Sequence, residues 1–472
     1  MVVSRVSQLA PALGAAATAG VAAAAWPWTV DDAWVTARYA RRILAGEGYT
    51  FVDGPPTDGV TGPLGLVPDL LGEALAGDPM LGAKLAGGIA AALGVALVIR
   101  RAGRESARHA VVTAVLVALW PLVGIWSVAG LETGLATLAA CGVAVALVEG
   151  RAVGLGLAVA AMAWLRPEAA PACAVALALF SREHGRRSAP AWALAVTGAL
   201  AVVAFRLALF GQPLPLSAAA KPADLGHGLE YTARAFLVVL GVFGALPVFF
   251  AVRAPGPRRG LAFVLGVHVL AVVLAGGDWM PGFRLFVPWL PALALVMAGP
   301  IAERLEPGAR ARRVGAVALA VGAVAVPAFA GALALLDARA GGAARDAAGA
   351  ELAAYLRATS QRVALVDVGY LGFASDRDLV DLGGITDPVI GRLAGGHVDK
   401  AIDPGLLLER DPDTIVLCSR IPPVVDEQGH LQRFAGHPVE GRVAAMPWVR
   451  AQMRVTRVEP YAPGVWYVVL SR

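Results

Sequence analysis

The sequence predicts an all-α polytopic membrane domain with about eleven transmembrane helices, followed by a small α/β domain outside the membrane. Hydrophobic residues make up 57% of the 472 residues and charged residues only 16%, whereas a soluble protein carries about 25% charged residues. Apolar runs of about 20 residues recur until position 335, and shorter apolar segments separated by turn residues follow. This composition excludes a soluble enzyme, a disordered chain and a coiled coil.

Nine apolar runs suit membrane-spanning helices, which need about 17–25 residues. They are 8–28, 80–99, 109–127, 132–149, 189–210, 234–252, 261–276, 284–302 and 314–335. The first run also suits a signal peptide, because Arg5 precedes its apolar core. A further run, 153–180, is interrupted by Arg166-Pro167-Glu168, which allows either one kinked helix or two short ones.

Arginine clusters decide between these alternatives. They follow the runs that end at residues 99, 149, 180, 252 and 302, and the positive-inside rule places them in the cytoplasm. All of them lie inside only if 153–180 enters and returns as two helices, 153–165 and 167–180. We therefore expect a multi-pass protein of the bacterial cytoplasmic (inner) membrane with a cytoplasmic N-terminus. Because the arginines flank apolar runs, they do not indicate nucleic-acid binding.

Residues 1–335 are expected to form the membrane domain, and residues 336–472 an extracytoplasmic domain. In the latter, 341–358 is predicted to be a helix, and Val363–Asp367, Leu379–Leu382, Thr414–Cys418 and Val465–Leu470 are predicted to be strands. We expect this domain to cap a pocket of the membrane domain and to contact the acceptor.

Charged residues near membrane depth all fall on the predicted outer face. They are Asp31, Asp32 and Arg38 in the first external loop (29–79), then Glu132, Arg166, Glu168, Lys221, Asp278 and Arg284. Such groups are costly in a bilayer and are usually functional. One of them alone is equally consistent with an interfacial anchor, but the set on one face predicts a shared site.

The first external loop begins with a predicted amphipathic helix that reaches about Leu44. Asp31 and Arg38 lie two turns apart on one face of it, and Tyr39 lies on the same side as Asp32. A carboxylate and a guanidinium at the membrane surface suit chemistry on a lipid phosphate, because the acid accepts a proton and the arginine holds the anion. We favour Asp31 as the base and Asp32 as a helix cap or sugar ligand; the reverse assignment stays open.

Several motifs resemble a branch of the GT-C membrane glycosyltransferases. This branch includes the terminal β-(1→2)-arabinofuranosyltransferases and a flagellar motor control protein. The opening Asp31-Asp32-Ala33 with Arg38-Tyr39-Ala40 and Gly46-Glu47-Gly48 resembles the family's first loop. Further matches, in order, are Gly130-Leu131-Glu132-Thr133, Arg166-Pro167-Glu168, Gly211-Gln212-Pro213-Leu214-Pro215 with Lys221, Gly276-Gly277-Asp278-Trp279-Met280 with Arg284, Asp367-Val368-Gly369-Tyr370 and Asp381-Leu382-Gly383-Gly384-Ile385-Thr386-Asp387.

The resemblance implies transfer of a sugar from a polyprenyl-phosphate donor, with inversion, to a cell-envelope glycan or lipid-linked acceptor. It implies that Asp31 or Asp32 acts as the base. Donor phosphate would be held by Arg38, Arg166, Lys221 and Arg284, and substrate by Tyr39, Asp58, Glu132, Glu168, Asp278 and Trp279. The chain departs from the pattern at Asp58, Ala169 and Leu216, so a pentofuranose such as arabinose is one candidate among sugars.

Two other function classes fit parts of the sequence. A non-enzymatic protein of flagellar or envelope assembly would keep the fold and the charges. A transporter would carry charges on both faces and repeated halves, which the sequence does not show. No cofactor is indicated, although a divalent metal is compatible with the chain: Asp376, Asp378, Asp381 and Asp387 are too sparse for a hard-metal loop, and His397, His430 and His437 too scattered for zinc.

Overall fold

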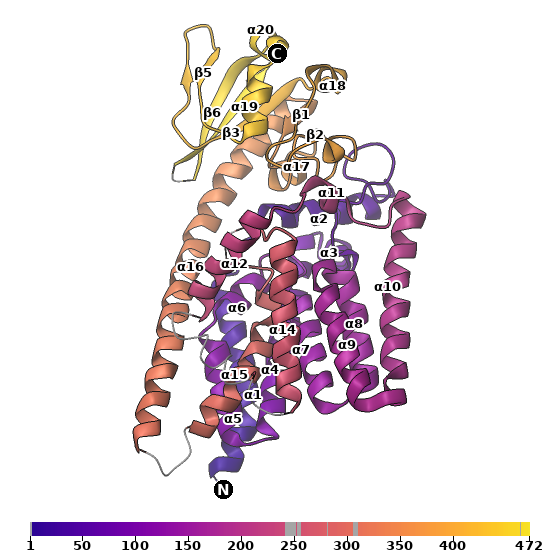
Figure 1. The fold of residues 1–472 in the computed structure, drawn as a ribbon. Coiled ribbons are helices and arrows are strands. Elements are labelled where there is room, and N and C mark those ends of the chain that lie inside the picture. The colour runs from indigo at the N-terminus through magenta and orange to yellow at the C-terminus, as the bar shows by residue number, and fades with distance from the viewer. Residues whose placement is uncertain (1, 241–251, 253–255, 281, 305–309, 463) are drawn as a thin grey trace.

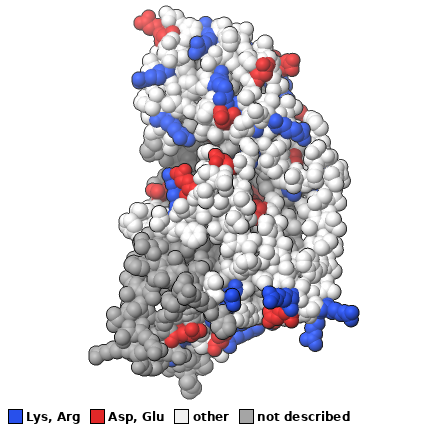
Figure 2. Space-filling view, viewed as in Figure 1, with Lys and Arg blue, Asp and Glu red and all other residues white. Residues whose placement is uncertain are grey.

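The computed structural model shows a bundle of long helices with a small sheet domain at one end (Figure 1). It describes residues 2–240, 252, 256–280, 282–304, 310–462 and 464–472. The N-terminus lies at the end of the bundle away from the sheet domain. On the face shown in Figure 2, charged residues lie at both ends of the bundle and on the sheet domain, and a band with few charges separates them.

Several helices coincide with predicted spans. They are α1 (Val2–Ala24), α4 (Pro79–Gly103), α7 (Thr133–Glu149), α10 (Ala189–Phe210) and α14 (Pro257–Leu274). Among the described residues, three segments are long and apolar enough to cross a membrane, namely Pro79–Gly103, Pro167–Phe210 and Pro257–Leu274. The other apolar helices are shorter. The number of eleven crossings is therefore not confirmed.

The run 153–180 forms two helices. α8 (Ala152–Leu165) ends at Arg166, and α9 (Ala170–His184) follows a single 3₁₀ turn, Pro167–Ala169. Proline is tolerated in the first turn of a helix because its missing N–H would have no partner there. Pro167 therefore starts the second arm of the hairpin and leaves Arg166 at its tip.

Two predicted spans are corrected by the structure. The run 109–127 is divided into α5 (Ala107–Ala118) and α6 (Leu122–Ser127), since Pro121 cannot supply an interior helix N–H. The run 284–302 begins as a loop and a 3₁₀ turn, and α15 (Leu290–Arg304) starts after them. Part of the run 234–252 lies outside the described residues; α12 covers Leu225–Leu240.

Helix α16 (Arg310–Thr359) joins the predicted helices 314–335 and 341–358 into one helix of 50 residues. The boundary expected between residues 335 and 336 falls within it. In Figure 1, α16 runs along the bundle and enters the sheet domain. A Cβ at Gly342 would lie 2.8 Å from the carbonyl oxygen of Pro27. Glycine therefore permits α16 to approach the chain between α1 and α2 (Asp31–Leu44).

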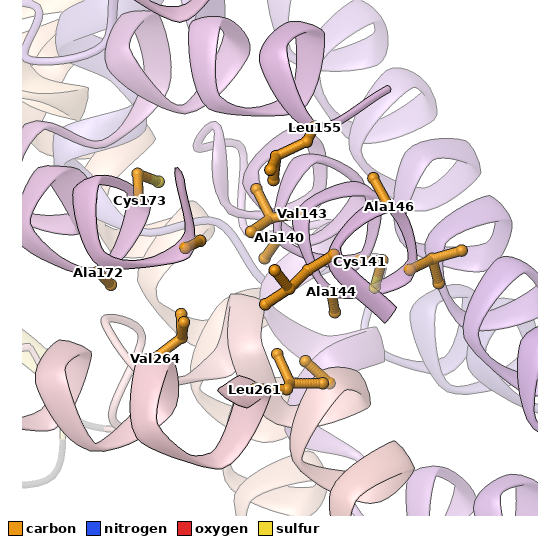
Figure 3. Close-up of a cluster of buried hydrophobic side chains, with 14 of the residues drawn as sticks. Ala140, Cys141, Val143, Ala144, Ala146, Leu155, Ala172, Cys173, Leu261 and Val264 are labelled. Carbon is orange, nitrogen blue, oxygen red and sulfur yellow. The ribbon is translucent and has the colours of Figure 1, made fainter. Parts of the chain in front are cut away.

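Small side chains allow the helices of the bundle to pack closely. Figure 3 shows Ala140, Val143 and Ala144 of α7 between Leu155 of α8 and Leu261 of α14. All five are fully buried. Small residues at helix contacts are typical of membrane proteins, in which van der Waals packing replaces the hydrophobic driving force.

The sheet domain contains a five-stranded mixed sheet of order β2-β1-β3-β7-β6. Its strands are β1 (Arg362–Leu365), β2 (Asp378–Asp381), β3 (Thr414–Ser419), β6 (Arg454–Ala462) and β7 (Val465–Ser471). The first three are parallel, and β7 is antiparallel to β3 and β6. A separate ribbon pairs β4 (Val424–Val425) with β5 (Leu431–Arg433). Short helices α17 (Tyr370–Ser375), α18 (Pro404–Glu409), α19 (Pro438–Ala445) and α20 (Pro447–Gln452) complete the domain.

Strand β6 is not predicted from the sequence. Its pairing with β7 shifts register between Val455 and Arg457 and again between Pro460 and Ala462. Such bulges break the alternation of apolar and polar residues by which a strand is recognised.

Lys400 holds one loop of this domain. Its side chain is fully buried, and Nζ donates to the carbonyl oxygens of Gly391, Leu393 and Gly395 at 2.9, 3.1 and 2.8 Å. Lys400→Met leaves these acceptors without the donor, at about 1–3 kcal/mol each. We expect the loop to open more readily, by about 3 kcal/mol, as measured by hydrogen exchange of amides 384–402 in the full chain. Arg392→Met, at an exposed position, is the control, and equal exchange in both variants would contradict the prediction.

Candidate active site

A cavity of about 240 Å³ lies where the loops of the bundle meet the sheet domain. We call it the central cavity. Its charged lining residues are Asp32, Glu132, Arg166, Glu168, Lys221, Asp278 and Arg284. Ile385 of the sheet domain also lines it. Seven of the twelve residues predicted for the site are thus brought together.

These seven residues come from five separate parts of the chain. Asp32 belongs to the first turn of α2, and Glu132 immediately precedes α7. Arg166 and Glu168 form the tip of the α8–α9 hairpin. Lys221 ends the short helix α11 (Leu216–Ala220). Asp278 and Arg284 lie in the loop between α14 and the turn before α15.

Every cation in the central cavity contacts an acid. Arg166 lies 3.1 Å from Glu132 and 3.5 Å from Glu168, and it also donates to Thr133 Oγ1 at 3.1 Å. Arg284 pairs with Asp278. Such pairing is required when ionisable groups are withdrawn from water.

The Lys221–Asp32 pair is looser than the others. Lys221 Nζ lies 3.9 Å from Asp32 Oδ2, and both side chains keep about a quarter to a third of their exposure. Among the described residues, Lys221 is the one whose side chain makes a polar contact with the Asp32 carboxylate. Asp32 and Lys221 are therefore the charged pair in the cavity most available to a ligand.

Asp278 is held in its ionised form. Burial alone would raise its pKa, but Arg284 and then Lys221 outweigh that effect, so the pKa lies below its ordinary value. Arg284 donates to both oxygens of Asp278 through Nε and Nη2. A guanidinium carries five N–H groups, so Asp278 can orient Arg284 while the Nη1 protons remain for an anion.

The structure does not bring Asp31 and Arg38 to the central cavity, which corrects their expected place in it. Asp31 accepts hydrogen bonds from the backbone N–H groups of Gly369 and Tyr370, at 3.0 and 2.8 Å. These residues lie at the start of α17 in the sheet domain. Burial and the nearby Asp367 raise the pKa of Asp31 to about 7. The two acids that begin α2 therefore point to different partners.

Arg38 holds the other end of α17. It is buried and donates to the carbonyl oxygens of Phe51 at 2.8 Å, of Gly372, and of Arg377 at 2.9 Å. Asp31 and Arg38 lie two turns apart on α2, as predicted. The two side chains contact the segment of α17, however, and leave no place for a sugar phosphate between them. We call this pair of contacts the α2–α17 clamp.

Glycine at position 369 makes the clamp possible. A Cβ there would lie 2.0 Å from the carbonyl oxygen of Asp31 and 2.5 Å from its Oδ2. Any side chain at this position would therefore separate α2 from the sheet domain.

Three other predicted residues lie outside the lining. Tyr39 is buried, and its hydroxyl contacts Thr57 Oγ1 at 2.6 Å and accepts from the Gly59 N–H at 3.2 Å. Asp58 pairs with Arg206 at 2.9 Å. Burial raises the pKa of Asp58 to about 6, although Arg206 opposes the shift. Both residues shape the loop of Gly59 and Thr61 that lines the cavity.

Trp279 follows the cavity residue Asp278 but is itself 57% exposed. Its ring stacks on His227 with centroids 4.3 Å apart.

Several residues that build the wall of the central cavity were not predicted from the sequence. Thr61 Oγ1 and Ser217 Oγ lie 2.8 Å apart in the cavity wall. Arg206 donates from Nη2 to the Thr61 carbonyl at 2.6 Å and so joins this wall to α10. A charged residue inside the apolar run 189–210 was the available signal for Arg206. Ser217 and Thr61 offered no such signal.

The aspartates of the sheet domain have structural partners. Asp381 accepts from the backbone N–H groups of Gly383, Gly384 and Thr386 at 2.7–2.9 Å. Asp387 accepts from Val389 and pairs with Arg410 at 3.1 Å. Within the described ranges, no group of three or more His, Cys, Asp or Glu side chains is arranged to hold a metal ion.

A second, apolar pocket has a volume of about 140 Å³, and its lining residue Phe286 directly follows Leu285 of the central cavity in the sequence. Its walls come from α12, α14 and the segment that opens α15, including Phe236, Leu265 and Leu293. Arg284 and Leu285 line the central cavity, and Phe286 lines the apolar pocket. Consecutive residues thus connect a charged site with an apolar one.

Comparison with known proteins shows the fold. The crystal structure of ArnT from Cupriavidus metallidurans bound to undecaprenyl phosphate is similar over 98% of this chain and 97% of that chain, with a TM-score of 0.59 and 16% identity. The apo structure of the same protein gives a TM-score of 0.56 with 15% identity, over 94% of each chain. At this identity the likeness shows that the chain has the fold of ArnT, whereas the arabinofuranosyltransferase branch is not confirmed.

Sequence comparison adds one match. The model of a domain of unknown function (DUF8728) matches residues 337–462, from within α16 to the end of β6. No curated protein sequence matches the chain.

The clamp predicts the effect of removing Arg38. Arg38→Leu leaves the buried carbonyl groups of Phe51, Gly372 and Arg377 without this donor, at about 1–3 kcal/mol each. We expect faster hydrogen exchange in 369–378 and faster proteolysis between the bundle and the sheet domain. Arg234→Leu is the control, because Arg234 is exposed and pairs with Glu230 of its own helix. If both variants exchange alike, the clamp does not hold the domains together.

Proposed function

We propose that this chain is a membrane glycosyltransferase that moves a sugar, with inversion, from a polyprenyl-phosphate donor to an extracytoplasmic glycan or glycolipid. The observation that carries the proposal is the meeting of seven charged residues in the central cavity beside an apolar pocket. ArnT, which shares the fold, has been crystallised with undecaprenyl phosphate. We propose a bacterial cytoplasmic membrane location, with the sheet domain outside.

The reaction requires a base, a cation and a place for the lipid. The acceptor hydroxyl attacks the anomeric carbon and gives its proton to a carboxylate. A new C–O bond forms as the bond from that carbon to the phosphate oxygen breaks, and the polyprenyl phosphate leaves with the bonding electrons. A cation stabilises the negative charge that develops on the phosphate.

We propose Asp32 as the base in place of Asp31. Asp32 lines the central cavity, and the described ion pair it makes is the loose contact with Lys221. Asp31 already accepts two backbone hydrogen bonds and lies outside the cavity. A base must reach the proton that it removes, and this geometric condition favours Asp32.

The donor would occupy both sites. Its phosphate would contact Arg284 and Lys221. Both cations lower the pKa of Asp278, so both lie near the same part of the cavity. Its apolar chain would follow Leu285 and Phe286 into the apolar pocket. Arg166, paired with Glu132 and Glu168, would set the shape of the opposite wall.

A donor panel tests the proposal. Purified protein is incubated with radiolabelled polyprenyl-phosphate pentoses and hexoses, and release of polyprenyl phosphate is measured with a membrane extract as acceptor. Asp32→Asn should reduce transfer by roughly 10²–10⁴-fold, the usual contribution of a general base, while donor binding persists. Asp31→Asn is the comparison variant: it removes a carboxylate of the clamp, so it should loosen the sheet domain but reduce transfer far less than Asp32→Asn does.

Two outcomes contradict this scheme. If Asp31→Asn is inactive and Asp32→Asn turns over normally, the roles are reversed. If the wild-type protein consumes no donor, the chain keeps the fold without the chemistry, as a protein of envelope or flagellar assembly would.

Arg284 allows a separate test of phosphate binding. Arg284→Lys keeps the charge but loses the planar set of donors that binds Asp278 and phosphate together. We expect the donor KM to rise by about tenfold or more, corresponding to about 1.4 kcal/mol. Arg206→Lys, which lies behind the cavity wall, should change the donor KM less. An unchanged donor KM in Arg284→Lys would exclude this arginine from the phosphate site.

A further inference from the structure

Trp279 is an exposed aromatic residue beside a polar cavity. Its side chain is 57% exposed, although Gly277 and Asp278, directly before it, line the central cavity. The backbone turns outward here because Gly276 and Gly277 both adopt positive φ, at 89° and 69°. Glycine alone adopts this conformation readily, so the sequence places Trp279 at the rim.

Two histidines hold the indole ring. His227 of α12 stacks on it with an interplanar angle of 14°, and His397 of the sheet domain meets it edge-on with centroids 5.7 Å apart. His227 Nδ1 lies 2.7 Å from the Gly276 carbonyl oxygen. Because a carbonyl only accepts, Nδ1 carries a proton and donates to it.

His397 presents a neutral ring to the same place. Burial, then Lys221, lowers its pKa to about 4, although Asp32 opposes the shift. These interactions place His397 near Lys221 and Asp32 of the central cavity. The rim thus combines an open aromatic surface with imidazole nitrogens.

We propose that Trp279, flanked by His227 and His397, is the subsite that binds the acceptor as a sugar ring. The C–H face of a saccharide is apolar and lies flat on an indole, and its hydroxyl groups can form hydrogen bonds with imidazole nitrogens. Charged or purely apolar ligands do not match this combination. The subsite rests on the proposed function for its role, because a sugar bound at the rim would direct a hydroxyl toward Asp32 inside.

The position separates acceptor from donor. In the proposed function the lipid would reach the cavity from the apolar pocket by way of Phe286 and Leu285, whereas Trp279 contacts His397 of the sheet domain. An exposed tryptophan also serves as an anchor at a membrane surface. An anchor has no need of a histidine from the sheet domain, so the His397 contact favours a ligand from the aqueous side.

Saturation-transfer NMR tests binding without relying on activity. The full-length protein in detergent is titrated with methyl α-D-arabinofuranoside, methyl α-D-mannopyranoside and methyl β-D-glucopyranoside. At least one should receive saturation on its ring C–H protons. Trp279→Ala should reduce that signal at least fivefold, and Trp279→Phe should retain at least half. Leu408→Ala, which removes an exposed apolar side chain of α18, is the matched control and should match the wild type.

Kinetics then separate the subsite from the proposed function. With the bound glycoside as acceptor, Trp279→Ala should raise the acceptor KM about tenfold and leave the donor KM unchanged. If the wild type consumes no donor, the proposed function fails while the NMR result still decides the subsite. No binding of any glycoside, equal signals in Trp279→Ala and wild type, or a change in donor KM alone would overturn the subsite and leave Trp279 as a membrane anchor.

Discussion

The contact between α2 and α17 sets the geometry of the site. Asp31 accepts hydrogen bonds from the N–H groups of Gly369 and Tyr370 at the start of α17, and Arg38 donates to the carbonyl oxygens of Gly372 and Arg377 toward its end. Arg38 is buried and Asp31 is half-buried, and each leaves costly unpaired partners if it is removed. Since Asp32 directly follows Asp31 on a rigid helix, the same contact that docks the sheet domain also orients the carboxylate that faces the cavity.

Charge neutralisation is the second constraint on the site. The central cavity collects four acids and three cations from distant parts of the chain, and each cation lies against an acid. Pairing lowers the cost of burying these groups, and it also fixes the side chains before a ligand arrives. The looser Lys221–Asp32 pair is the exception, and it lies where a sugar phosphate and an acceptor hydroxyl would have to meet.

The two sides of the cavity differ in a way that suits two substrates. Toward the bundle, Phe286 and its neighbours in α12 and α14 offer apolar walls. Toward the sheet domain, Ile385 closes the cavity and His397 contacts Trp279 at the rim. In the reaction that we propose, a lipid-linked donor and a hydrophilic acceptor would approach the reacting atoms along separate paths.

The local pattern of apolar and charged residues in the sequence determined many of the helices and strands of this protein. Apolar run lengths predicted the helical bundle, because burial in lipid acts on each segment separately. The arginine clusters, with the interruption at Arg166, predicted the α8–α9 hairpin. Four of the five strands of the main sheet also followed from local alternation, whereas bulges hid β6. The topology derived from the arginine clusters indicated which charges share a face, and seven of the twelve site residues line one cavity.

Tertiary structure alone shows that Asp31 and Asp32 have different partners. The two acids are adjacent and equally placed for the membrane surface, so no local property distinguishes them. Their partners do: Gly369 and Tyr370 lie more than 330 residues away in the chain, and only folding brings their N–H groups to Asp31. The same holds for Arg206, Ser217 and His397, whose contacts with the site depend on packing between distant segments rather than on periodicity.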